Sequence, residues 1–212
     1  MRTLVAVLSI AALMALAPAC KKTAKESPAA TAAPEGSAAT QAPPAPAAPS
    51  GALTDPQIAA IVVSANQVDI DAGELAIKKT KNEEVKKFAQ RMVTDHTAVN
   101  KAAVELVTKL RVTPEDSDAS RGLASGGAEA RARLEKLEGD AFDRAYVDNE
   151  VAYHKAVIGV LDSQLIPSAT NPELKSTLVA VKPAFDAHLQ HAVQVQEALS
   201  GSGSAGHAQH GM

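Results

Sequence analysis

Four long segments of the chain repeat apolar residues every three or four positions, the spacing that places them on one face of a helix. They cover about residues 54–80, 82–110, 140–165 and 172–199. Helix-starting residues precede them, namely Thr54-Asp55-Pro56, Asn82, Asp140 and Asn171-Pro172. Residues 112–127 carry Pro, Asp, Ser and Gly and are predicted to form a loop, followed by a short polar helix over 128–137.

Two parts of this pattern resemble each other. Residues 82–96 and 171–188 share a cap residue, an acidic first turn, an apolar-Lys pair and a later His. Two related helical hairpins would produce this internal similarity. We therefore expect an all-α fold, an antiparallel four-helix bundle over residues 53–200.

The first twenty residues have the layout of a bacterial lipoprotein signal. Arg2 precedes an apolar run over 4–16, and small residues at 17–19 lead to Cys20, the only cysteine. The run is too short to span a bilayer as a mature helix. We expect residues 1–19 to be a signal peptide and Cys20 to be lipidated. The alternative is an ordinary leader cut after Ala19, with Cys20 a chance thiol.

Low-complexity segments flank the predicted bundle. Residues 20–52 are rich in Ala and Pro and cannot bury enough apolar surface to order themselves, which predicts a disordered linker. Residues 201–212 contain Gly, Ser and two histidines, His207 and His210, and are predicted to be a flexible tail. Solvated tail histidines are the default interpretation, with weak metal capture as the alternative.

Composition excludes several classes of function. The net charge is −3, from 21 basic and 24 acidic residues, which argues against a nucleic-acid-binding protein. Aromatic residues make up only 2% of the chain, so platforms that stack bases or sugars are not expected. No Gly-x-Ser-x-Gly elbow or phosphate loop is present, and no Gly-x-Gly-x-x-Gly turn follows a strand pattern, as a dinucleotide fingerprint requires.

Five polar residues interrupt the apolar faces near the middle of the helices. They are Asp69, His96, Glu150, His154 and His188. Asp69 lies 12 residues before Lys81 and His96 lies 15 residues after it, so a short turn would bring the two within roughly 5 Å of the same height. Glu150 and His154 are four residues apart and share a face. The five side chains are therefore expected to converge on one layer.

Such a layer has two interpretations. Carboxylates and imidazoles from several helices suit iron, manganese, zinc or copper. Alternatively, each His pairs with Asp or Glu in a buried polar layer that sets helix register without a metal. The Glu-x-x-His motif of di-iron bundles is absent, because Glu150 and His154 form Glu-x-x-x-His.

Four segments of the chain are distinctive in sequence and in order: VDIDAGELAIKKTKNEEVKKFAQRMVTDHTAVN (68–100), GDAFDRAYVDNEVAYHKAVI (139–158), NPELK (171–175) and DAHL (186–189). Together they resemble a family of bacterial envelope proteins called domain of unknown function 4142. The resemblance implies a ferritin-like fold over about residues 54–200. The family's recurrent acidic and His positions map to Asp69, Asp71, His96, His154 and His188, although the family often has Glu at the two Asp positions.

These observations give ordered expectations for function. We expect an outer-membrane lipoprotein that faces the periplasm, because Lys21 replaces the Asp that signals inner-membrane retention. Its first expected role is a non-enzymatic envelope or stress-related module that contacts an envelope protein. The alternative is a transition-metal-binding protein that uses the five polar residues. A di-metal oxidoreductase comes third, because it needs more bridging carboxylates than the helices offer.

Overall fold

The computed structural model describes residues 52–205 and the side chains of residues 52–201. The expected signal peptide, Cys20, nearly all of the linker, and His207 and His210 lie outside the described residues. Every regular element within residues 52–205 is helical, which confirms the all-α prediction. None of the helices in this range is both long and apolar enough to cross a membrane.

Five long helices account for most of the described chain. They are α1 (Asp55–Lys79), α2 (Glu83–Leu110), α3 (Asp118–Leu134), α4 (Gly139–Val160) and α6 (Pro172–Ala205). After Val160 the chain stays helical but widens into a π-helical segment, η1 (Leu161–Leu165), and then forms one turn, α5 (Ile166–Ser168). A π-helix is a rare local expansion of the helical backbone, and it often occurs at functional sites.

The helix ends are set by the residues that the sequence pattern singles out. Thr54 caps α1 in a capping box with Gln57, and the Asn82 side chain accepts hydrogen bonds from the N–H groups of Glu84 and Val85. These contacts satisfy backbone donors that have no partner within the helix. At the other end of α2, Arg111 adopts a left-handed conformation with φ 56° and stops the helix.

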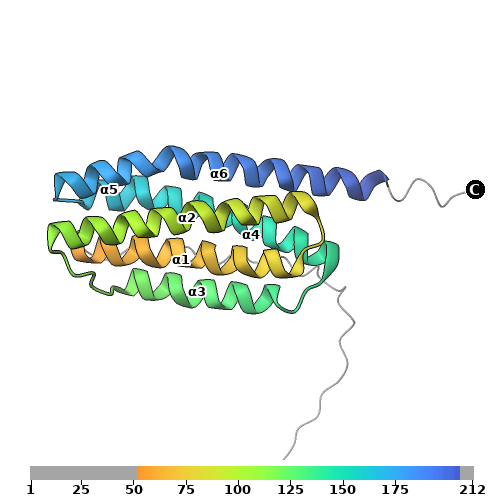
Figure 1. Ribbon diagram of the computed structural model, residues 1–212, viewed down its shortest axis with the longest axis horizontal. Helices are drawn as coiled ribbons and strands as arrows, with labels where there is room; N and C mark the ends of the chain where they lie inside the picture. Colours follow the sequence, from red (N-terminus) through yellow and green to blue (C-terminus); the bar gives the residue numbers. More distant parts are fainter. Residues whose placement is uncertain (1–51, 206–212) are drawn as a thin grey trace, which may run out of the picture. The chain divides into compact units, whose positions relative to one another are not determined.

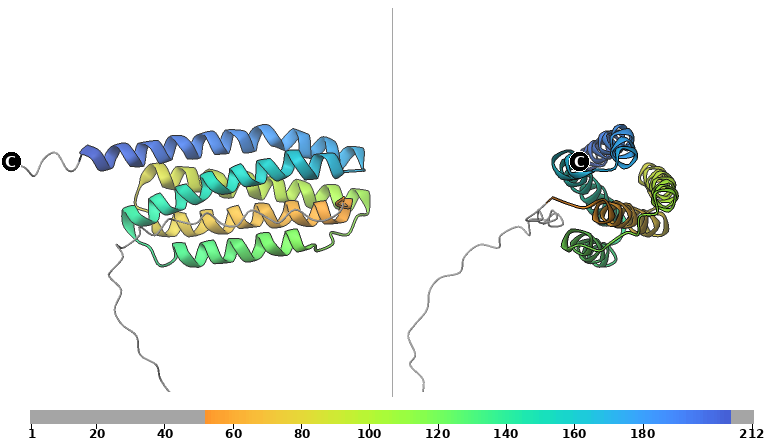
Figure 2. Two further views of the ribbon diagram at one scale, coloured as in Figure 1. Left: turned by 180° about the vertical axis from the view of Figure 1, so that it is seen from behind. Right: turned by 90° about the vertical axis from the view of Figure 1, so that its left-hand side faces the viewer.

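Four of the helices surround a shared core. Helix α1 packs mainly against α2, and α4 packs mainly against α6; α2 also contacts α6, and α1 contacts α4. Figure 1 shows that each main pair runs side by side in opposite directions. Helix α3 packs on α1, and the end-on view in Figure 2 places it outside the other four helices.

The apolar core is divided into two halves. One half includes Ile58 and Ala65 of α1 together with Phe185 of α6. The other includes Ala72 of α1 and Ala192 of α6. Between these halves lie the buried polar residues Asn66 and Asp69 on α1 and His188 on α6. The fold therefore places a polar layer across the middle of an otherwise apolar interior.

The prediction for residues 112–127 is wrong over much of its length, because α3 begins at Asp118 inside the expected loop. A capping box between Ser117 and Ser120 starts the helix. One of the glycines that indicated a loop, Gly127, instead allows close packing. A Cβ atom on Gly127 would lie only 2.5 Å from a methyl carbon of Val68 on α1.

This contact predicts opposite effects for two glycine substitutions in α3. Gly127→Ala should destabilise the protein by about 1–2 kcal/mol, because the branched Val68 side chain has little freedom to move aside. Gly122→Ala should stabilise it by about 0.5–1 kcal/mol, because its Cβ would meet nothing within 4 Å and alanine favours the helix. Urea unfolding followed by circular dichroism measures both, and equal effects would contradict the packing described.

Candidate metal centre

The four core helices each contribute to one buried polar cluster. Asp69 comes from α1, His96 from α2, Glu150 and His154 from α4, and His188 from α6. Each of the five residues is at most 3% exposed. Their candidate ligand atoms form two groups, His96/His154/His188 and Asp69/Glu150/His154, and within each group these atoms lie within 4.8 Å of one another. The structure thus brings together all five residues that the sequence singled out.

The His96 ring is held in one orientation by Asn66. The Nδ1 atom of His96 lies 2.7 Å from Oδ1 of Asn66. The Asn66 amide nitrogen donates in turn to the carbonyl of Val62 at 2.8 Å, which leaves its Oδ1 atom as the acceptor. His96 therefore carries its proton on Nδ1, and the lone pair of its Nε2 atom faces the cluster.

The other two rings are held in the same way. His154 donates from Nδ1 to the backbone carbonyl of Glu150 at 3.0 Å. His188 donates from Nε2 to Oδ2 of Asp95 at 2.9 Å. The remaining nitrogens are His96 Nε2, His154 Nε2 and His188 Nδ1. All three are buried and have no hydrogen-bond partner within the described part of the chain.

Burial keeps these imidazoles neutral. Loss of water, together with repulsion from the neighbouring His154 and His188, lowers the pKa of His96 to about 2. Burial also lowers the pKa of His154 to about 4. For His188, burial lowers the pKa although the bond to Asp95 opposes the shift. Three unprotonated nitrogens are therefore available at neutral pH, as metal coordination requires.

The two carboxyl groups are shifted in the opposite direction. Burial raises the pKa of Asp69 well above its ordinary value, and repulsion from Glu150 raises it further. Burial raises the pKa of Glu150 to about 8. Without a cation, these groups hold protons at neutral pH because two adjacent carboxylates cannot both ionise in an interior that lacks water.

The distances disfavour a polar layer that satisfies its own hydrogen bonds. His96 Nε2 is 3.6 Å from Asp69 Oδ2, and His154 Nδ1 is 3.6 Å from Glu150 Oε2. Both separations exceed the usual N–H···O range of 2.7–3.2 Å. Asp69 and Glu150 share a hydrogen bond through the protons that they retain, but the nitrogens of His96, His154 and His188 that face the cluster have no partner among the described residues. Buried polar atoms are rarely left without a partner, so these nitrogens are candidate metal ligands.

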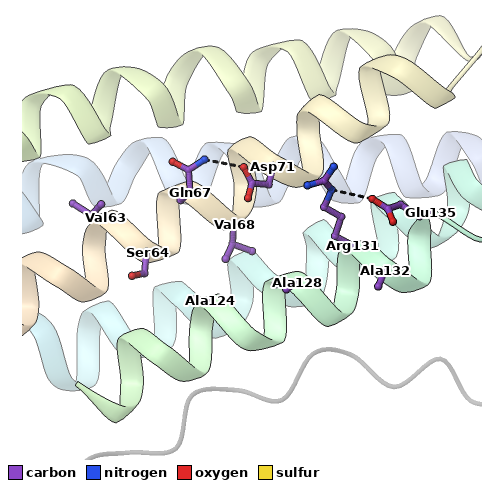
Figure 3. Close-up of a pocket in the computed structure, with 11 residues that line it drawn as sticks. Val63, Ser64, Gln67, Val68, Asp71, Ala124, Ala128, Arg131, Ala132 and Glu135 are labelled. Carbon is purple, nitrogen blue, oxygen red and sulfur yellow. Dashed lines mark hydrogen bonds and ion pairs between the residues drawn. The ribbon is translucent and has the colours of Figure 1, made fainter. Parts of the chain in front are cut away.

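Asp71, the second acidic position indicated by the family resemblance, lies elsewhere. It borders a groove of about 460 Å³ between α1 and α3, where its carboxylate accepts a hydrogen bond from Gln67 at 2.8 Å. Arg131 and Glu135 form an ion pair 3.3 Å long on the α3 side of this groove (Figure 3). These polar groups are already paired and partly solvated, so the larger hollow carries less evidence of chemistry than the cluster.

Sequence reasoning missed the residues that orient the histidines. Asn66 lies one turn before Asp69 on α1, and a polar amide on an apolar face is a signal that could have found it. Asp95 precedes His96 and is 38% exposed through its side chain, so its pattern is that of a surface residue. Only the packing of α2 against α6 brings it to His188.

A pH dependence follows for the metal-free protein. Between pH 4.5 and 8 the folded state keeps the Glu150 proton that the unfolded state loses, so stability falls as pH rises. The buried histidines have the opposite effect on stability, but only below their unfolded pKa of 6.5, where the unfolded state binds protons that the folded state does not. From pH 6.5 to 8, the free energy of unfolding of the metal-free wild type should therefore fall by about 1–2 kcal/mol more than that of Glu150→Gln, because the glutamine carries no titratable proton. Urea unfolding across this range tests it, and parallel curves would refute it.

Comparison with known proteins places these residues in a family. A family model described as "Domain of unknown function (DUF4142)" matches residues 38–195, a range that includes all five residues of the cluster. Neither the curated proteins nor the solved structures contain a match to the chain. Because the matched range covers well over half of its length, the chain belongs to the DUF4142 family, whose domain has no assigned function.

Proposed function

We propose that this protein binds a transition-metal ion through His96, His154 and His188, with Asp69 and Glu150 supplying oxygen ligands and negative charge. The observation that carries the proposal is the orientation of the three imidazoles. Each is fixed by a hydrogen bond from one nitrogen and leaves the other nitrogen unpartnered within the cluster. Metal-binding histidines have this arrangement, in which an acceptor behind the ring sets its tautomer.

The donor set limits the choice of metal. Imidazole nitrogens suit zinc, copper and iron, and carboxylates also accommodate manganese. Magnesium and calcium prefer sites made only of oxygen ligands. The candidates are therefore iron, manganese, zinc or copper, bound as divalent ions.

Charge balance links metal binding to proton release. In the metal-free protein Asp69 and Glu150 are protonated, because burial raises the pKa of both and repulsion from Glu150 raises the pKa of Asp69 further. A divalent cation would offset two negative charges and so favour ionisation of both groups. Binding is therefore expected to release protons and to tighten as pH rises toward 8.

The setting of this site is also part of the proposal. We infer a ferritin-like four-helix bundle of α1, α2, α4 and α6, with α3 as a cover. The leader-like start and Cys20 support a lipoprotein anchored to the outer membrane and facing the periplasm.

An envelope module that acts through protein contacts remains the second candidate, and an apolar groove between α2 and α6 favours it. A di-metal oxidoreductase is disfavoured because, within residues 52–201, only two carboxyl groups join the cluster.

Metal analysis tests the proposal directly. The test protein is the full chain carrying Cys20→Ser, His207→Ala and His210→Ala, which removes the proposed lipid attachment and the tail imidazoles. We call it the background chain. After dialysis against each candidate ion and then against buffer, it should retain close to one equivalent of at least one metal. Adding His154→Ala should lower the retained metal at least about tenfold, because His154 belongs to both ligand groups.

His191→Ala provides the matched control. His191 lies on α6 with His188 but belongs to neither ligand group. Its loss should leave metal content unchanged, and circular dichroism should show that both variants remain helical. A background chain that retains none of the four metals, or equal losses in the two variants, would rule out this site.

Asn66 provides a second test, because it holds a ligand without contacting the metal. Asn66→Leu removes the acceptor for His96 Nδ1 and should weaken metal binding by about 10–100-fold. Asn66→Asp keeps an acceptor at this position and should restore most of the affinity. Competition with a chromophoric chelator measures the dissociation constants, and equal affinities for the two variants would show that Asn66 does not position His96.

A further inference from the structure

A narrow cavity of about 30 Å³ lies directly beside the polar cluster. Asn66, Asp69, His96 and His154 form its polar wall. The rest of its lining is apolar and includes Val62, Leu161, Leu165 and Phe185. Glu150 and His188 do not line it, so the cavity meets the cluster from one side only.

The lining indicates what kind of molecule this space accepts. A water molecule needs roughly 10–15 Å³ and two to four polar partners, whereas cavities lined by Leu, Ile and Phe stay dry and bind apolar guests such as xenon. Four of the lining residues are polar, but almost all of the surface that faces the cavity is apolar, so a water molecule would find few hydrogen-bond partners there. A guest of about two heavy atoms, uncharged and apolar, fits both the volume and the lining.

A wider hollow lies on the other side of the cavity wall. An apolar groove of about 260 Å³ runs between α2 and α6, where Ala98, Ala102 and Ala103 keep the α2 side shallow. Val62, Leu178 and Val181 line both the groove and the cavity. These three side chains are therefore the layer that separates the two spaces. Val62 and Val181 are only partly buried, so changes of their side-chain rotamers can open this layer to a small molecule.

We propose that the cavity binds a small uncharged apolar molecule, of the size of dioxygen, which reaches it from the α2/α6 groove by passing Val62, Leu178 and Val181. The binding itself does not require a metal. The bound molecule would lie against the side of the cluster formed by Asp69, His96 and His154. Its contact with a metal ion rests on the proposed function. A metal held by these residues would then have beside it an apolar space that disfavours charged competitors.

Xenon is the probe, and the metal-free background chain is the protein. With methyl groups of Val and Leu labelled, xenon pressure should give saturable NMR shifts at Leu161, Leu165 and Leu178, and none at the exposed Val104. Because the protein is metal-free, failure here would remove the cavity proposal and leave the metal proposal standing. The two proposals are therefore tested separately, the metal site by retained metal and the cavity by xenon shifts.

Three variants locate the site and its entrance. Ala65→Val adds methyl groups to the cavity wall and should abolish the xenon shifts. Ala102 lines the groove but not the cavity, so Ala102→Val should leave the xenon shifts unchanged. Val181→Ala thins the shared layer and should speed xenon exchange severalfold without lowering its affinity. Shifts confined to groove residues such as Val99 and Leu106, or shifts that persist in Ala65→Val, would overturn the proposal.

Should Ala65→Val fail to fold, Val181→Ala still decides the question. Val181 is only partly buried, so removing two methyl groups there is a mild change. A thinner layer must change the exchange rate if molecules pass through it. An exchange rate equal to that of the background chain, measured by saturation transfer between free and bound xenon, would exclude this route.

Discussion

The interior of this protein depends on how it accommodates ionisable groups without water. Five such side chains lie in one layer, and each is almost fully buried. Charging any one of them alone in a dry interior would cost several kcal/mol, so the histidines stay neutral and the carboxyls keep their protons. The layer is tolerated because the halves of the apolar core on either side of it supply the packing energy. A cation changes this balance, because it lets the carboxyls ionise and gives the imidazole lone pairs a partner.

Regular periodicity explains how much of this fold could be predicted from the sequence. The four core helices and their starting residues follow from apolar spacing and from Thr54 and Asn82, because these signals act locally. Helix α3 could not be found in the same way. Gly126 and Gly127 have poor intrinsic helix propensity, and packing of α3 against α1 outweighs it. The helix exists because a neighbouring surface accepts it, and a local pattern does not contain that information.

In the candidate site, too, some features follow from local sequence and others only from the packing of the helices. Helix midpoints were enough to predict that Asp69, His96 and His188 would lie at one height, because the rise per residue is fixed. The rotation of each helix about its axis was not fixed, and this decides which nitrogen faces the cluster. Asn66 and Asp95 select those nitrogens, and both act across helix boundaries. The types of ligand were therefore readable from the chain, but the orientation that makes them usable was not.

The π-helical segment η1 has an evolutionary consequence. Leu161 and Leu165 both lie in this segment and both line the cavity, whereas His154 and Glu150 precede it on regular α-helix. A π-segment holds one residue more per turn than an α-helix, so a single deletion there could restore a regular helix. Such a deletion would redraw the cavity while leaving the ligands of α4 upstream of the change. Relatives of this chain could thus diverge in the molecules they admit while conserving the same five polar residues.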